Sequence, residues 1–322
     1  FEDPYRYCDS DREKTAVRTA ENLAQARQSA RESMVLLKND GVLPLAEGEK
    51  IAVIGKPAAT PNEYVGCWCA QGWGHGGMSI LDAVISRAGR DNVIYAKGCE
   101  ISGNDRSGFN EALRIARQAD KVVFVMGEHR EMSGEAAARS DIRIPGVQTE
   151  LLERLVAEGH KVAVVLMNGR PLDLSRESVL ASAILDAWFP GSMGGPAVAD
   201  VLYNDYNPSG KLTMTFPRSV GQVPIFYYAK NTGRPAEAGT GKYLSKYIDI
   251  PNSPLYPFGY GLSYTTFSYD GLSLSSDRLF DGGEVKVSVN VTNTGKYEGT
   301  EVVQLYICLL YTSPSPRDST SS

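Results

Sequence analysis

The sequence predicts an α/β domain, a mostly parallel-sheet sandwich, followed by a small β module. Three observations lead to this fold class. Short runs of Val, Ile and Leu alternate with helical segments between residues 51 and 203, as in a parallel sheet covered on both faces. The spacing from one such run to the next fits βαβ units. After Pro217 helical periodicity ends, and Pro, Gly and Tyr become frequent.

A long helix is predicted before the first apolar run. Ala, Gln, Glu and Arg dominate from Ala16 to Lys38, and neither Gly nor Pro interrupts them. Gly41 and Pro44 then end the helix.

The next segments alternate between strands and helices at the spacing of βαβ units. The predicted strands and one further apolar segment are Ile51–Gly55, Asn92–Ala96, Lys121–Gly127, Lys161–Gly169 and Ala181–Phe189. The predicted helices are Ser79–Arg87, Asn110–Ala119, Val147–Glu158 and Gly195–Tyr203. Functional groups of such sheets gather in the loops at the carboxyl ends of the strands. The two long loops there, Lys56–Met78 and Glu128–Ile144, are therefore the places to look for a site.

The C-terminal part predicts antiparallel strands with one buried face. Residues Gly283–Gly295 and Gly299–Ile307 show the alternating pattern. About three strands fit, fewer than the roughly seven of an immunoglobulin-like sandwich, so we expect a truncated module. Residues 308–322 are rich in Ser, Pro and Thr and resemble translated sequencing-adapter sequence, which predicts a non-native tail.

Composition excludes several classes of function. The net charge of −5 gives no basic patch for nucleic acid, and no apolar run is long enough to insert into a membrane. Five scattered cysteines do not form a disulfide framework. Cys67 and Cys69 lie near His75, but a fourth ligand and the usual zinc spacing are absent, so we expect no metal.

Several segments, in order, resemble glycoside hydrolase family 3, in particular its bacterial periplasmic β-glucosidases. The segments are ARESMVLLKNDGVLPL, GEHREMSGEAAARSDIRIPGVQTELL, VLMNGRPL, WFPGSMGGPAVADVLYNDYNPSGKLTMTFPRSVGQVP and LYPFGYGLSYTTF. The resemblance runs from Phe1 to about Ile307 and implies a three-part enzyme: a (β/α)₈ barrel, an α/β sandwich and a fibronectin-type-III-like module.

The resemblance also implies domain boundaries. Residues 1–29 are the exit segment of a missing N-terminal barrel and a linker helix, and residues 30–217 are the α/β sandwich. Residues 218–267 connect it to the truncated fibronectin-type-III-like domain, 268–307. No position matches the family's nucleophile motif, so the barrel of the same polypeptide is the expected partner. A periplasmic or extracellular location and the absence of a cofactor are implied in the same way.

By the resemblance, Glu135 in MSGEAAAR is the general acid/base. Retaining glycosidases use two carboxyl groups roughly 5–5.5 Å apart, one as nucleophile and one as acid and then base. The acid must hold its proton near neutral pH, which burial or the second carboxylate provides. Gly134 and the run Ala136–Ala138 leave little bulk around Glu135. The alternative is an ordinary solvated glutamate.

Other residues of the two loops have a structural and a functional interpretation. Glu128 either contacts sugar or, as we favour, anchors the loop, and Glu131 is a rival carboxylate. Arg139 is a candidate substrate-proximal residue, but an ion pair with Asp141 or a cap at the loop's exit is the interpretation we favour. His129 is interpreted as a polar loop residue.

Trp68 and Trp73, on the other loop, form either a sugar-stacking wall or a hydrophobic plug. The leading hypothesis is a retaining β-glucosidase-type glycoside hydrolase acting on terminal β-linked glucosyl residues, with Glu135 as acid/base. β-Glucosides or oligosaccharides are then its ligands, and the chain alone is expected to be inactive. The alternatives are a non-catalytic carbohydrate-binding or scaffolding fragment and a flavodoxin-like ligand-binding domain.

Overall fold

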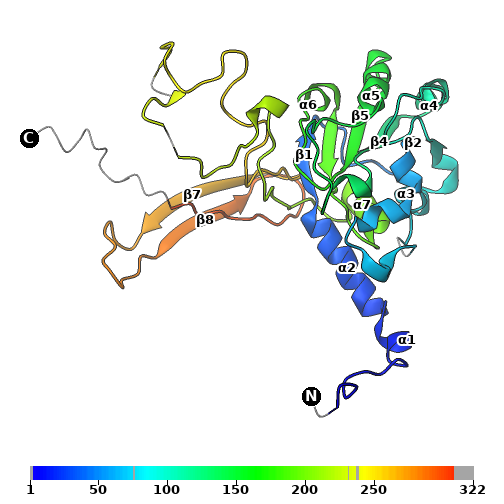
Figure 1. Cartoon of the computed structure of the whole chain (residues 1–322), viewed down its shortest axis with the longest axis horizontal. Helices are drawn as coiled ribbons and strands as arrows, with labels where there is room; N and C mark the ends of the chain where they lie inside the picture. The colour runs from blue at the N-terminus through cyan, green and yellow to red at the C-terminus, as the bar shows by residue number, and fades with distance from the viewer. Residues whose placement is uncertain (1–2, 75–76, 231, 237–238, 308–322) are drawn as a thin grey trace, which may run out of the picture.

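The computed structural model describes residues 3–74, 77–230, 232–236 and 239–307. Its main body is a six-stranded sheet with helices on both faces, and a two-stranded arm extends from one side (Figure 1). The strands of the main sheet are β1 (Val35–Asn39), β2 (Ile51–Ile54), β3 (Val93–Ala96), β4 (Lys121–Gly127), β5 (Val162–Met167) and β6 (Ala183–Asp186). The predicted mostly parallel α/β class is confirmed.

The sheet has the order β1-β6-β5-β4-β2-β3, and only β1 runs antiparallel to its neighbour. Alternate side chains of each strand enter different cores. Phe124 and Met126 of β4 face one cluster of buried residues, while Val123 and Val125 face the other. Burial on both faces explains why these strands are continuous apolar runs.

Three helices cover each face of the sheet. One set is α2 (Ala20–Ser33), α3 (Ile80–Ala88) and α7 (Gly194–Leu202), and the other is α4 (Phe109–Ala116), α5 (Gln148–Ala157) and α6 (Glu177–Leu180). A short helix, α1 (Glu13–Ala16), precedes α2. The α2 helix is attached to α7 by Arg27, whose Nε lies 2.7 Å from Asp200 Oδ2.

The prediction of one helix from Ala16 to Lys38 was wrong at both ends. The α2 helix begins after Thr19, whose side chain accepts a hydrogen bond from Asn22 N, and it ends at Ser33. The apolar residues that follow form β1 instead. Pairing with β6 gives the β1 backbone hydrogen-bond partners along one edge, and Val35, Leu36 and Leu37 are buried. Tertiary contacts therefore override the helical propensity of the segment.

The arm consists of the antiparallel strands β7 (Phe267–Leu274) and β8 (Val287–Asn293). The third predicted strand, residues 299–307, is wrong. That segment contacts its neighbours through side chains, with Gln304 Nε2 donating to Gly259 O at 2.9 Å, and forms no strand ladder.

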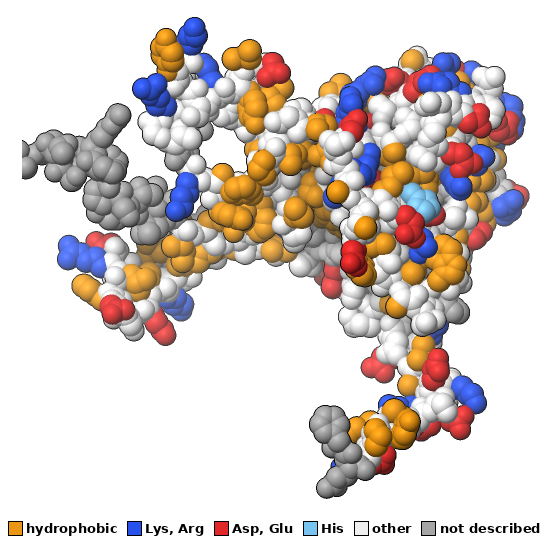
Figure 2. All heavy atoms as spheres, in the orientation of Figure 1, with side chains coloured by type: hydrophobic (Ala, Val, Ile, Leu, Met, Phe, Trp, Pro, Cys, Tyr) orange, Lys and Arg blue, Asp and Glu red, His pale blue; other side chains and the backbone are white. Residues whose placement is uncertain are grey.

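The buried face predicted for the arm is also wrong. Tyr269, Leu272 and Val291 are 48%, 72% and 38% exposed, because in the described ranges no second sheet packs on them. Figure 2 shows apolar side chains along this arm. The predicted tail, residues 308–322, lies outside the described residues.

Candidate active site

The two long loops meet at one edge of the main sheet. They follow β2 and β4, which are parallel neighbours, so their carboxyl ends lie together. One close approach of the two loops is at Gly134. A Cβ there would lie 2.4 Å from Cys67 Sγ and 3.1 Å from Trp68 Nε1. Only glycine fits, and its φ of +97° also favours glycine. The predicted loops therefore form one site.

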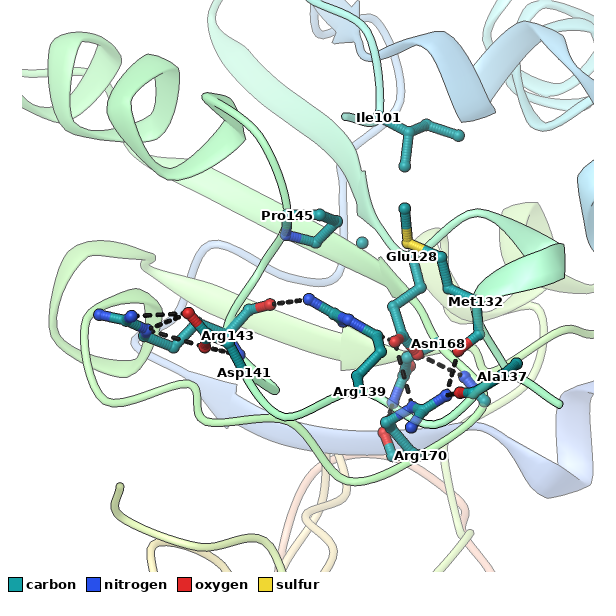
Figure 3. Close-up of polar contacts among 12 residues, drawn as sticks. Ile101, Glu128, Met132, Ala137, Arg139, Asp141, Arg143, Pro145, Asn168 and Arg170 are labelled. Atoms are coloured by element: carbon teal, nitrogen blue, oxygen red, sulfur yellow. Dashed lines mark hydrogen bonds and ion pairs between the residues drawn. The ribbon is translucent and has the colours of Figure 1, made fainter. Parts of the chain in front are cut away.

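Glu128 forms the base of the Glu128–Ile144 loop and is fully buried. Its Oε1 lies 2.6 Å from Arg139 Nη1 and 3.2 Å from Arg170 Nε, and its Oε2 accepts a hydrogen bond from Gly169 N at 3.2 Å (Figure 3). With these partners, the carboxylate holds both ends of the loop and a neighbouring turn. The geometry agrees with the anchoring role favoured for Glu128.

Arg170 comes from the turn after β5 and extends the anchor into the loop. Its Nη2 donates to Met132 O and, at 2.8 Å, to Ala137 O (Figure 3). These carbonyls lie on either side of Glu135 in the chain. The Arg170 guanidinium therefore links the buried Glu128 carboxylate to the backbone on both sides of the loop tip. Sequence reasoning missed Arg170, because its contribution depends on the pairing of β5 with β4.

Glu135 lies at the exposed tip of the loop. Ala136, which follows it, has a left-handed backbone with φ +58°, so the chain turns sharply at this point. In the described part of the chain, no donor lies within hydrogen-bond distance of the Glu135 carboxylate. The loop tip therefore carries a carboxyl group that has no partner among the described residues, and Arg170 holds the backbone on both sides of it. Such a group is available to a proton acceptor or donor outside the loop.

The expected pairing of Arg139 with Asp141 is wrong. Arg139 turns inward to Glu128, and its Nη2 donates to Arg143 O at 2.9 Å. Asp141 pairs with Arg143, whose Nη2 lies 2.6 Å from Asp141 Oδ2. Hydrogen bonds from Arg143 lower the pKa of Asp141 to about 2. The buried carboxylate attracts Arg139 because it has no solvent to compete for the guanidinium.

A second contact between the loops involves Glu63, which the sequence analysis missed. Glu63 is 7% exposed, its Oε1 lies 3.3 Å from His129 Nε2, and its Oε2 accepts a hydrogen bond from Arg130 N at 3.0 Å. No local pattern distinguishes this glutamate in the sequence. His129 is thus a polar residue that joins the two loops.

The two tryptophans are not a buried plug, since Trp68 is 72% exposed and Trp73 is 54% exposed. The Arg130 guanidinium carbon lies 3.5 Å from the centre of one Trp73 ring, so Arg130 covers part of this side chain. Trp68 lies against Gly134, next to Glu135 in the chain. Their exposure is compatible with the predicted stacking wall.

Within the described ranges, no group of three or more Cys, His, Asp or Glu side chains could hold a metal ion. Cys67 and Cys69 are half-buried free thiols, and burial raises the pKa of Cys99 to about 11. His75 and Cys308 lie outside the described residues. None of the helices in those ranges is long and apolar enough to cross a membrane.

The sheet order and the two loops at its carboxyl edge define an α/β domain with a carboxylate-bearing loop. The family model of the glycosyl hydrolase family 3 C-terminal domain matches residues 34–264. The chain belongs to this family.

The similar proteins include a β-glucosidase and a β-xylosidase. The chain is 44% identical to a periplasmic β-glucosidase of Salmonella typhimurium over 95% of its own length and 44% of the relative's. It is 41% identical to a β-xylosidase of Formosa agariphila, with 92% of this chain and 41% of the relative covered. The chain therefore spans less than half the length of these relatives.

Solved structures agree with the fold. A mutant β-glucosidase from Listeria innocua in complex with laminaribiose superposes with a TM-score of 0.86 at 35% identity, covering 93% of this chain and 41% of that one. A β-glucosidase from Erythrobacter marinus gives a TM-score of 0.75 at 34% identity, with 88% and 40% covered.

Proposed function

We propose that this chain is the acid/base-bearing part of a retaining β-glucosidase that removes terminal β-linked glucosyl residues. The observation that carries the proposal is the state of Glu135: an exposed carboxylate that has no partner among the described residues, on a loop anchored by Glu128, Arg139 and Arg170. Membership of glycosyl hydrolase family 3 and relatives named β-glucosidases support it.

In this reaction Glu135 first acts as an acid. It donates its proton to the glycosidic oxygen while a carboxylate nucleophile attacks the anomeric carbon, and the leaving sugar departs as an alcohol. Glu135 then removes a proton from the water that hydrolyses the glycosyl-enzyme bond. In our proposal the nucleophile belongs to a barrel domain of the same polypeptide, and the enzyme works in the periplasm or outside the cell.

The two loops have different tasks in the proposed site. Glu135 moves protons, whereas the Trp68 and Trp73 side chains on the facing loop offer apolar ring surface to a sugar. Arg130 covers part of Trp73 and donates to Gly66 O at 3.4 Å. This arginine of the loop after β4 therefore contacts the Trp73 loop at two points. Glu128 and Arg139 hold the loop and do not contact substrate.

The test joins this chain to the part of the Salmonella typhimurium β-glucosidase that this chain does not cover, which we expect to hold the barrel, and measures aryl β-glucoside hydrolysis. Glu135→Gln should lower kcat by about 10²–10⁴-fold, the contribution typical of a general acid/base. The loss should be larger for poor leaving groups than for good ones, because only poor leaving groups need the proton. The isolated chain should show no turnover.

Glu131→Gln is the control for an exposed carboxylate on the same loop that differs from Glu135 in having a partner, since its Oε1 lies 2.6 Å from Arg130 Nη2. It should leave kcat within about twofold of the parent, as surface substitutions usually do. If Glu135→Gln behaves like this control, the acid/base assignment is wrong. Saturable binding of β-glucosides without any turnover in the joined protein would favour the carbohydrate-binding alternative.

A further inference from the structure

Asp186 is a buried carboxyl group that the proposed reaction does not use. It ends β6, is 0% exposed, and lies directly opposite Leu166 of β5. Its Oδ1 accepts a hydrogen bond from Trp188 N at 3.1 Å. Its Oδ2 is buried and has no hydrogen-bond partner in the described part of the chain. No ion pair of the described residues includes it, so a charge here would be uncompensated.

The Asn168 side chain is a polar neighbour of this carboxyl group. It follows β5, two residues beyond Leu166, and therefore projects from the same face of the sheet as Asp186. Its Nδ2 donates to Arg170 O at 2.8 Å, which fixes the amide, since the reversed amide would bring two oxygens together. Among described residues its Oδ1, also buried, has no partner.

Two neighbouring buried oxygens without a donor indicate an additional proton. A buried acceptor left unpaired is destabilising, and natural proteins rarely leave one. If Asp186 is protonated at Oδ2, that O–H can donate to Asn168 Oδ1. The one hydrogen bond then satisfies both oxygens. Burial raises the pKa of Asp186 well above its usual range, against smaller opposing effects of the Trp188 N–H and the Asn168 side chain.

We propose that Asp186 is a positioning residue: its carboxyl group donates a hydrogen bond to Asn168 Oδ1, and the series Asp186–Asn168–Arg170 fixes the loop that carries Glu135. Asn168 holds the Arg170 backbone, and the Arg170 guanidinium holds Met132 O and Ala137 O. The effect on the loop is independent of catalysis, whereas any effect on kcat rests on the proposed function.

The experiment compares Asp186→Asn with Asp186→Ala in the full chain. Asparagine is neutral, nearly isosteric and able to donate to Asn168 Oδ1 while accepting from Trp188 N. Hydrogen–deuterium exchange is measured on peptides that cover residues 132–139, with peptides from β4 and β5 as internal references. Asp186→Asn should exchange as the parent does, and Asp186→Ala should exchange about tenfold faster in the loop only.

Two results would overturn the proposal. Loop exchange unchanged in Asp186→Ala would show that the residue does not position the loop. Fast exchange in Asp186→Asn would show that an ionised carboxylate is needed. If Asp186→Ala does not fold, infrared difference spectra decide. The spectrum of the parent minus that of Asp186→Asn should contain the C=O band of a protonated carboxylic acid. A carboxylate band in its place would show that Asp186 is ionised and would refute the proposal.

A catalytic readout separates this proposal from the proposed function. In the barrel-joined enzyme, Asp186→Ala should lower kcat more than it changes KM, and Asp186→Asn should restore kcat. If Glu135→Gln retains activity, the acid/base assignment fails while the exchange experiment still tests the Asp186 series. If Glu135→Gln is inactive but Asp186→Ala has parental exchange and kcat, only the positioning proposal fails.

Discussion

Two carboxylates on one loop, Glu128 and Glu135, have opposite surroundings. Glu128 is fully buried and its oxygens are shared between two arginines and a backbone N–H, whereas Glu135 is exposed and has no partner in the described part of the chain. A paired, fully buried carboxylate fixes geometry but is not accessible to a substrate. An exposed one is free to react but adds little to stability. The loop thus assigns positioning and chemistry to different residues.

The largest effect expected from this difference is at the base of the loop. Glu128→Gln removes one charge of a buried network and leaves Arg139 and Arg170 without a carboxylate. The free energy of unfolding should fall by about 3 kcal/mol, as when one partner of a buried ion pair is lost. Urea unfolding measures it. A loss no greater than that of Glu131→Gln would remove the distinction between base and tip.

The contact between the two loops should have the next largest effect. Gly134→Ala forces a left-handed backbone on alanine and places Cβ against Cys67 Sγ, so we expect a loss of about 1–3 kcal/mol in urea unfolding. Gly103→Ala is the matched control, since Gly103 has φ +89° but open space around its Cβ. Equal losses would mean that the approach of the loops contributes nothing.

The pH dependence of stability gives a smaller, directional effect. Burial raises the pKa of Asp186 in the folded protein, so above about pH 4, the unfolded value, the folded state keeps a proton that the unfolded chain releases. The stabilisation is complete below that pH and is lost as the pH rises through the folded pKa, by at most about 1.4 kcal/mol per pH unit. The difference between parent and Asp186→Asn in urea unfolding should therefore decline with rising pH.

Asp141→Asn serves as a control of opposite sign. Arg143 lowers the pKa of Asp141 to about 2, so its contribution is present above the unfolded value and is lost as the pH falls towards 2. A difference between parent and Asp186→Asn that stays flat with pH would contradict a protonated Asp186.

The smallest effect is expected at the tip. Glu135→Gln removes an exposed carboxylate that no described residue contacts by a hydrogen bond or ion pair, so the free energy of unfolding should stay within about 0.5 kcal/mol of the parent. The same urea titration measures it. A loss comparable to that of Glu128→Gln would show that the tip is also structural, and the interpretation of the two carboxylates would have to change.

The elements that the sequence predicted well are those whose pattern is local. The β4 and β5 strands are uninterrupted apolar runs, and the loop after β4 was recognisable by its length alone. The β1 strand was missed because its identity depends on pairing with β6, far along the chain. Residues 299–307 alternate like a strand but pair with no other strand in the ranges that the structure describes.

The site divides in the same way. Glu135 was reached through its flanking residues and the family resemblance, while the partners of Glu128 were not predictable from its own loop. Arg170 joins it from the turn after β5, and Arg139 selects the buried carboxylate over the nearer Asp141. In the sequence, Asp186 is one polar residue in the apolar run AILDA. That its Oδ2 is buried and has no partner among the described residues could be seen only in the structure.

The position of β1 has a consequence for the order of folding during synthesis. This strand is made before every other strand of the sheet, yet it pairs with β6, the last one made. Until residues 183–186 have left the ribosome, the apolar residues Val35, Leu36 and Leu37 have no strand to pair with. Such long-range closure is slow, and the waiting segment is open to wrong partners. The nascent chain should therefore depend on chaperones until β6 appears.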